Sequence, residues 1–160
     1  MHTQGSIFEE LGFDPNAVKQ PESAVVYALA RTYNLLVRRL SLIYRQFGLT
    51  VSGFNLLLLL QRGKDPDSFT QREIGKRLVV SASDMSGLID RMEKKGLVKR
   101  TSGKDRRSYL LRSTHKGKKL VEKVWPKHAL AIEQMTLVLD SQDRENLLRV
   151  LSKLRGSMGL

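Results

Sequence analysis

The sequence predicts a mainly α-helical fold (α with a small β-hairpin wing), a winged helix-turn-helix with N- and C-terminal helices forming a dimerisation region. Three observations support this prediction. Two helix-capping patterns lie eleven residues apart, which is the spacing of a helix-turn-helix. Two short strand patterns joined by a polar loop follow directly, as in a winged helix. Long amphipathic segments flank this central region on both sides.

The helix pair is predicted from its capping residues. The Thr70 hydroxyl can accept from the backbone N–H of Glu73, whose carboxylate reaches back to the Thr70 backbone. Ser81 and Asp84 repeat this spacing and open a second helix, which runs to about Lys95. The inner face of the second helix is expected to consist of Met85, Leu88 and Met92.

The predicted hairpin begins after Gly96, which ends the second helix. Residues 97–101 and 107–112 have the pattern of two short strands, and the polar residues 102–106 form the loop between them. A helix-turn-helix followed by such a hairpin is a winged helix.

Two helices are expected before the helix pair. Apolar residues recur every three or four positions over 22–47, and Gly48 is a suitable C-terminal stop. A second helix over 50–62 carries apolar residues on more than one side, which predicts that it is covered by several neighbours.

Two more helices are expected after the hairpin. Thr114 opens a helix that continues to Leu139 and that Pro126 should kink or make locally irregular. Asp140, with Asp143 three positions on, caps a last helix to about residue 155.

Positive charge is concentrated in the middle of the chain. The sequence has 28 Lys and Arg against 16 Asp and Glu, a net charge of +12. Residues 70–119 hold 15 of the basic residues and 5 of the acidic ones, and so carry +10 of that charge. A field of this sign attracts polyanions, first nucleic acid and second an acidic membrane surface. The alternative is a protein that is basic without a nucleic-acid partner.

Several classes of protein are disfavoured. The chain has no cysteine, which removes disulfides, thiolate catalysis and cysteine metal sites. His2, His115 and His128 are scattered without metal-ligand spacing, so no metal and no cofactor is expected. No nucleophile–base pairing and no Gly-rich phosphate loop is present, so an enzyme is not expected. No signal peptide or membrane-spanning run is found, and we expect a cytoplasmic protein.

Three stretches of sequence resemble the MarR family of transcription regulators. The segment Asp105-Arg106-Arg107-Ser108-Tyr109-Leu110-Leu111-Arg112-Ser113-Thr114, followed by Lys116-Gly117, is similar to the family's wing signature. Residues 90–100 resemble the end of its recognition helix and its first wing strand, and Gly48-Leu49-Thr50 resembles the start of its second helix. The resemblance covers residues 22–155.

This resemblance implies a homodimer whose terminal helices associate while two winged-helix lobes bind adjacent turns of double-stranded DNA. It also implies a regulator, usually a repressor, that a small aromatic or phenolic effector often releases from DNA. The expected division of the chain is a tail at 1–21, dimerisation helices at 22–49 and 114–160, and a DNA-binding domain at 50–113. Apolar residues of the tail (Ile7, Phe8, Leu11 and Phe13) can dock on a neighbour, such as a second subunit.

Departures from the family pattern occur at three positions. Gly87 falls on the exposed face of the recognition helix, where relatives often carry a longer side chain, and Gly53 and Ser113 also replace larger residues. Gly87 reduces the number of base contacts and costs the helix roughly 1 kcal/mol relative to alanine.

Candidate DNA contacts fall into three groups. Small residues on the outer face of the recognition helix are expected to meet base edges: Ser81, Ala82, Ser83, Ser86 and Gly87. In the wing, Arg106 is suited to the minor groove and Asp105 to bracing an arginine, with Lys104 and Arg107 beside them. The candidate phosphate contacts are Arg72, Lys76, Arg77, Lys94 and Lys99. Each of these can also be an ordinary solvated residue.

Aromatic residues of the helices are candidates for an effector pocket. They are Tyr27, Tyr33, Tyr44, Phe54 and Trp125, and their helical spacing fits plain core packing equally well. The sequence thus favours a sequence-specific, DNA-binding transcription regulator, with a nonspecific architectural nucleic-acid-binding protein as the alternative. Gly87 mildly favours the alternative.

Overall fold

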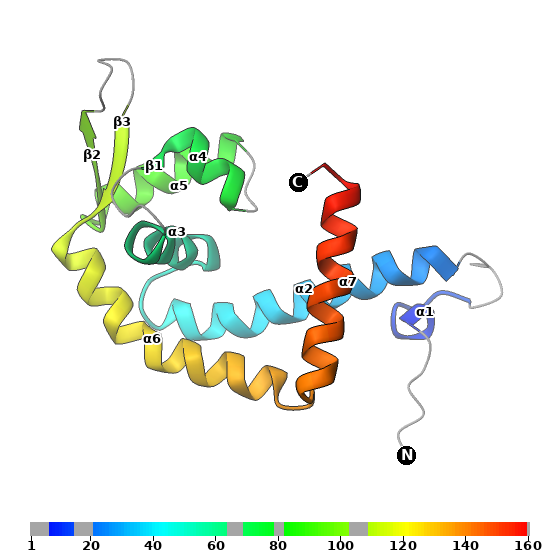
Figure 1. Cartoon of the computed structure of the whole chain (residues 1–160). Coiled ribbons are helices and arrows are strands. Elements are labelled where there is room, and N and C mark those ends of the chain that lie inside the picture. The colour runs from blue at the N-terminus through cyan, green and yellow to red at the C-terminus, as the bar shows by residue number, and fades with distance from the viewer. Residues whose placement is uncertain (1–6, 15–20, 64–68, 79–81, 103–108, 160) are drawn as a thin grey trace.

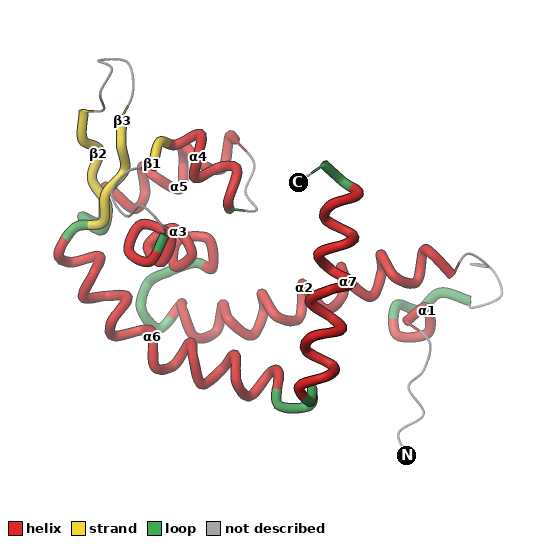
Figure 2. Tube along the Cα trace, in the orientation of Figure 1, coloured by secondary structure: helices red, strands yellow, loops and turns green. Residues whose placement is uncertain are grey.

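The computed structural model describes residues 7–14, 21–63, 69–78, 82–102 and 109–159. They form a mainly helical molecule with a small antiparallel sheet (Figures 1 and 2). The elements, in chain order, are α1 (Ile7–Glu10), α2 (Pro21–Arg45), α3 (Val51–Arg62), β1 (Phe69–Thr70), α4 (Gln71–Arg77), α5 (Ala82–Lys94), β2 (Val98–Ser102), β3 (Tyr109–Ser113), α6 (His115–Thr136) and α7 (Ser141–Ser157). The predicted fold class, a helical protein with a winged helix-turn-helix at its centre, is confirmed.

The sheet has one strand more than the sequence predicted. The strand order is β1-β3-β2, and the short strand β1 pairs Phe69 with Leu111 and Thr70 with Leu110. The sequence pattern identifies Thr70 only as a helix cap. A two-residue strand is too short to show the alternation that identifies longer strands, so no sequence pattern indicated it. The two predicted strands are present, with bounds shifted by one or two residues.

Helix α3 lies at the centre of the hydrophobic core. Its Phe54, Leu56, Leu57 and Leu60 are completely buried, which confirms that this helix is covered on more than one side. α2, α5, α6 and β3 all contact it. Because Leu56 and Leu57 point in different directions around the helix, elements from both ends of the chain are held together by this one helix.

Helix caps occur where the sequence placed them. Thr50 and Thr114 each accept a hydrogen bond from the backbone three residues ahead, and Thr70 with Glu73 forms a complete capping box. Asp140 forms a second box with Asp143. Gly48 and Gly96 both adopt a φ of 67°, the left-handed conformation that ends α2 and α5. The predicted cap at Ser81 lies outside the described residues.

Helix α6 runs unbroken past Pro126 and ends at Thr136, three residues earlier than predicted. The expected irregularity at Pro126 therefore does not interrupt the helix. α6 lies along α2 in the lower part of Figure 1, while α7 leaves its end at a steep angle. None of the α7 side chains is buried.

The outer helices expose many large apolar side chains. On α2 they include Val25, Val26, Tyr33 and Leu36; on α6, Leu130 and Ile132; in the α6–α7 connection, Leu137 and Val138; and on α7, Leu147, Leu148 and Val150. The predicted apolar faces are thus present, and within the described chain no element covers these side chains.

The stretch expected to be a tail contains the short helix α1, which packs on α2 of its own chain. Phe8 is buried, and its ring centroid lies 6.1 Å from that of Tyr27 in an edge-on arrangement. The Phe13 ring lies 5.6 Å from Tyr27. The neighbour on which these phenylalanines dock is therefore the chain's own second helix.

Gly117 is predicted to be essential for the junction of β2, β3 and α6. A Cβ at this position would lie 2.2 Å from the Leu97 carbonyl oxygen and 2.7 Å from Ser113 Oγ, so Gly117→Ala forces backbone to move. We expect a loss of about 2 kcal/mol or more in the free energy of unfolding, measured by urea denaturation at fixed protein concentration. The control is Gly75→Ala, where nothing lies within 4 Å, and which should gain roughly 0.5–1 kcal/mol. Equal stability of the two variants would contradict this packing.

Candidate nucleic-acid interface and effector cavity

Helix α5 is fixed to the core by one apolar face. Met85, Leu88 and Met92 are all buried, as predicted, and Ile89, which was not predicted, is completely buried beside them. The opposite face carries the exposed Ser86. Gly87 is half-buried, and a Cβ there would meet only the end of the flexible Arg91 side chain, at 3.1 Å.

A hydrogen bond links the exposed surfaces of α4 and α5. Gln71, the first residue of α4, donates from Nε2 to Ser86 Oγ at 2.7 Å. Gln71 was not among the predicted site residues because nothing in the sequence shows which residues of the two helices meet. Ala82 and Ser83 lie in the first turn of α5, and Ser81 lies outside the described residues.

Arg100 joins α5 to the hairpin. Its guanidinium contacts Asp90 Oδ1 at 2.5 Å and also pairs with Glu93, and its backbone N–H donates to Glu93 Oε1 at 3.2 Å. The hydrogen bond with Asp90 is the largest cause that raises the pKa of Arg100 above its usual value. Two of the three acids of α5, Asp90 and Glu93, are thereby paired with a cation of β2. In the sequence Arg100 is one basic residue among many, and no local pattern there indicates this role.

The predicted phosphate contacts differ in their surroundings. Arg72, Lys76, Lys94 and Lys99 are exposed or partly exposed. Arg77 is instead held by the structure, since it donates to the Glu73 carbonyl at 3.0 Å and lies 4.9 Å from the centre of the Phe69 ring.

An additional basic residue lies beside Lys99. Arg112 is its direct partner across the β2–β3 ladder, and both side chains are exposed. Opposed residues of an antiparallel pair lie on the same face of a sheet, and two like charges there repel. A phosphate placed between them would relieve that repulsion. The predicted wing residues Lys104, Asp105, Arg106 and Arg107 lie outside the described residues.

The Thr70–Glu73 capping box includes a charged group, the carboxylate of Glu73. The Thr70 backbone N–H and hydroxyl both donate to Glu73 Oε2, at 2.7 and 2.8 Å. These hydrogen bonds lower the pKa of Glu73 below its usual value. The carboxylate therefore stays ionised at neutral pH, and its contribution to the start of α4 is lost only as the pH falls through that lowered pKa.

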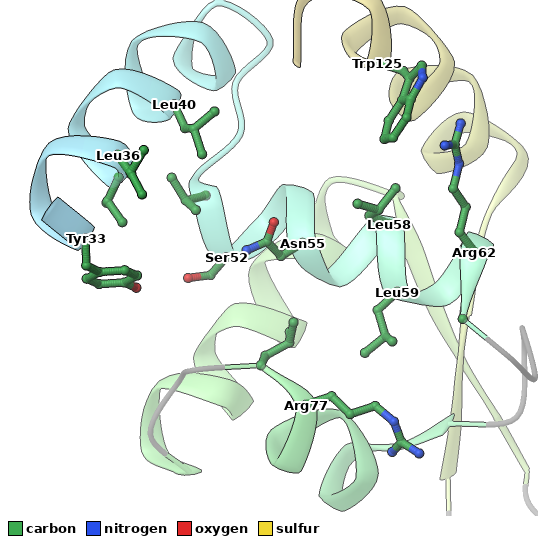
Figure 3. A pocket seen from close by; sticks show the side chains of 14 residues that line it. Tyr33, Leu36, Leu40, Ser52, Asn55, Leu58, Leu59, Arg62, Arg77 and Trp125 are labelled. Carbon is green, nitrogen blue, oxygen red and sulfur yellow. The ribbon is translucent and has the colours of Figure 1, made fainter. Parts of the chain in front are cut away.

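A cavity of about 690 Å³ lies between the outer helices and the helix pair (Figure 3). This volume is typical of small-molecule sites. Its walls come from α2, α3, α6 and the end of α4: Tyr33, Leu36, Val37, Leu40, Val51, Ser52, Asn55, Leu58, Leu59, Arg62, Gly63, Arg77, Leu78 and Trp125. The lining is mainly apolar, with Arg62 and Arg77 as its charged groups.

The five predicted pocket aromatics do not lie together. Tyr33 and Trp125 line the cavity. Tyr44 and Phe54 are completely buried and stacked at 4.6 Å, so they are core residues rather than pocket residues. Tyr27 lies against α1 instead. Hydrophobic periodicity identifies a face of a helix but not which part of that face remains open, and this explains the correction.

Polar side chains connect the cavity to the core. The Arg62 guanidinium lies 3.6 Å from the centre of the Trp125 ring, a cation–π contact. The centre of the His128 ring lies 5.2 Å from that of the Trp125 ring, and His128 Nδ1 is 2.8 Å from Tyr44 Oη. Burial, and secondly the charge of Arg62, lower the pKa of His128, while burial raises the pKa of Tyr44 to about 12. Both side chains are therefore neutral at physiological pH.

Neither a metal site nor a membrane-spanning helix is found in the described part of the chain. No three of its His, Asp and Glu side chains are grouped to hold an ion. None of its helices combines the length and apolar character needed to cross a bilayer.

A helix pair whose second helix is braced to a β-hairpin defines a winged helix-turn-helix, a class of DNA-binding domain. A model of the MarR family matches residues 47–108. The uncharacterised regulator YkoM of Bacillus subtilis is 32% identical over 111 residues, which cover 68% of this chain and 70% of YkoM. The regulator MhqR of the same species is 28% identical over 119 residues, 73% of this chain and 79% of MhqR. The chain therefore belongs to the MarR family, whose members are DNA-binding transcription regulators and not enzymes.

Solved structures show the same fold. AbsC, a MarR-family regulator of Streptomyces coelicolor, superposes with a TM-score of 0.79 at 23% identity, over 88% of this chain and 96% of AbsC. MepR of S. aureus, solved as a DNA complex, gives a TM-score of 0.76 at 22% identity, over 87% of this chain and 99% of MepR.

Two variants should separate the structural role of Arg100, which joins α5 to β2, from the role of a cation that contacts DNA. Arg100→Met leaves Asp90 and Glu93 without their partner, and we expect a loss of about 1–2 kcal/mol in unfolding free energy. The matched control is the neighbouring Lys99→Met, which removes the same charge from an exposed position without an ion pair among the described residues. It should not lower stability, because it also removes the repulsion with Arg112. It should lower the log–log salt slope of DNA binding by about one for each phosphate that Lys99 neutralises. Identical melting of both variants would refute the brace.

Proposed function

We propose that this chain is a sequence-specific repressor that binds a palindromic operator as a homodimer and is released by a small-molecule ligand. The observation that carries the proposal is the bracing of α5 by Arg100, which fastens an exposed helix face to a basic hairpin. Direct readout needs a helix held in a fixed orientation to the backbone-contacting groups. An architectural binder without sequence preference needs only the charge.

In this proposal α5 enters the major groove, and the residues that meet base edges are Ser81, Ala82, Ser83, Ser86 and Gly87. Arg106 enters the adjacent minor groove, and Lys104, Asp105 and Arg107 orient and support it. The side chains of Arg72, Lys76, Lys94 and Lys99 contact phosphates, with Arg112 added as the partner of Lys99. Arg77 is exposed and remains a candidate in this group, although its guanidinium also donates to the Glu73 carbonyl beside the cavity.

The exposed apolar faces of the outer helices support association with a second copy. α7 buries none of its own side chains, and Leu137 and Val138 are 76% and 86% exposed. Such faces are stable in water when a partner covers them. In a symmetric dimer formed through α2, α6 and α7, the two copies of α5 are expected to lie about 34 Å apart, one turn of the duplex. Residues 50–113 would then form the DNA-binding domain and 22–49 with 114–160 the dimerisation region.

The cavity is the proposed effector site. CouR of Rhodococcus jostii was solved bound to p-coumaroyl-CoA, and DNA binding by BpsR of Bordetella bronchiseptica is regulated by 6-hydroxynicotinic acid. An aromatic or phenolic ligand fits the apolar walls here, and an anionic group on it would be attracted by Arg62 and Arg77.

A comparison of two duplexes tests sequence specificity. Gel shifts at physiological salt should give an affinity at least tenfold higher for DNA flanking the chain's own gene than for scrambled DNA of the same composition. Footprinting on the flanking DNA should show two protected half-sites about one turn apart. Equal affinities would reject the repressor in favour of the architectural alternative.

Arg106→Ala is expected to weaken binding to that flanking DNA about tenfold or more, because each subunit loses its minor-groove cation. Sedimentation should show an intact dimer. The control, Lys153→Ala, removes one charge from the exposed surface of α7 and should bind DNA normally. Unchanged affinity of Arg106→Ala at fixed salt would remove that residue from the proposed interface.

Ligand binding can be followed through Trp125, the single tryptophan of the chain, because it lines the cavity. Titration with 4-hydroxybenzoate should change its fluorescence saturably and lower DNA affinity in parallel. Asn55→Phe places a ring in the cavity from a position whose side chain is exposed, and should abolish both effects while the protein remains folded. A response that is the same in this variant would place the ligand elsewhere.

A further inference from the structure

The hydrogen bond between Gln71 and Ser86 has consequences for how α5 meets DNA. It joins the first residue of α4 to the fifth residue of α5, fifteen positions apart, on a surface that solvent reaches. In the proposed complex this surface faces the major groove. A contact between two exposed side chains at that place affects what a base edge encounters.

Gln71 is held in position by its neighbours in the chain. Thr70, directly before it, pairs with Leu110 of β3 and is bonded through its backbone and hydroxyl to Glu73. The backbone that carries Gln71 is therefore fixed to both the sheet and the first turn of α4. Because this backbone is fixed, less conformational entropy is lost when the Gln71 amide contacts α5.

The direction of this hydrogen bond decides what Ser86 can offer. A serine hydroxyl has one hydrogen and two lone pairs. The Gln71 amide donates to Oγ and so occupies a lone pair, and the hydroxyl hydrogen cannot point at a group that is itself donating. The Ser86 hydrogen is thereby turned away from Gln71 and becomes available to an acceptor.

We propose that Gln71 is a positioning residue for DNA reading: by donating to Ser86 Oγ, it presents the Ser86 hydroxyl to the major groove as a hydrogen-bond donor. The base edges that match this donor are acceptors, namely purine N7, guanine O6 and thymine O4. This inference rests on the proposed insertion of α5 into the major groove.

Selection from a random duplex library, followed by sequencing, measures the base preference at every position and needs no known operator. The wild type should show a symmetric pair of positions at which an acceptor is preferred over a donor about threefold to tenfold, the value of one hydrogen bond. Ser86→Ala should lose that preference and identify the positions. Gln71→Ala should reduce it to a similar extent, although Gln71 itself need not touch the base.

Two further variants separate positioning from direct contact. In the double variant Gln71→Ala/Ser86→Ala, the loss should equal that of Ser86→Ala alone, because Gln71 acts through Ser86. Gln71→Glu should accept the hydroxyl hydrogen and turn a lone pair toward the DNA, shifting the same positions toward adenine and cytosine amino groups. The added negative charge lowers overall affinity but cannot by itself reverse a base preference. Thermal melting should be nearly unchanged in all variants, since both side chains are exposed.

The outcomes distinguish this inference from the function on which it depends. A wild type that selects no sequence would overturn both. A selective wild type whose preference survives Gln71→Ala, or additive losses in the double variant, would overturn the positioning role alone. A preference for amino groups at the Ser86 positions in the wild type would overturn the assigned direction of the hydrogen bond.

Discussion

The backbone around Leu97 holds the two parts of the molecule together. The Thr114 N–H donates to the Leu97 carbonyl at 3.1 Å, and the Thr114 hydroxyl donates to the Gly96 carbonyl at 2.7 Å. Here the chain leaves α5 for β2 and, after the hairpin, returns from β3 into α6. Gly117 lets α6 approach this carbonyl without a side chain between them. The first turn of α6 and the end of α5 are therefore in direct backbone contact, with no side chain between them.

The cavity lies on the other side of α3 from this junction. Its walls belong both to the outer helices, through Tyr33 and Trp125, and to the helix pair, through Arg77. Arg77 is bonded to the carbonyl of Glu73, whose carboxylate caps α4. A ligand that drew Arg77 into the cavity would act on the helix from which Gln71 reaches α5. A link between a ligand in the cavity and the surface of α5 would thus require only contacts within α4 and the Gln71–Ser86 hydrogen bond.

Local sequence signals determined most of the fold, and tertiary contacts determined the rest. Thr70 with Glu73, and Asp140 with Asp143, are caps because the chemistry involves residues three apart, which a sequence displays directly. The inner face of α5 followed from periodicity. Strand β1, the Arg100 brace and the Gln71–Ser86 bond were not predicted, since each joins residues whose proximity depends on how elements pack. The pocket was only partly predicted for the same reason: Tyr44 and Tyr33 share one helix, yet one is buried and the other lines the cavity.

Part of the basic hairpin does not favour the stability of the free protein. Lys99 and Arg112 face each other across the ladder, where a neutral or oppositely charged pair would hold the strands together better. In contrast, the charges of Asp90 and Glu93 are both paired with Arg100 on the adjoining strand, and these ion pairs hold α5 to the hairpin. The same strand therefore carries one cation that is satisfied internally and one, Lys99, opposed by a like charge. Repulsion of that kind is relieved by a polyanion, so the charge that weakens the free hairpin becomes favourable when a phosphate backbone lies along it.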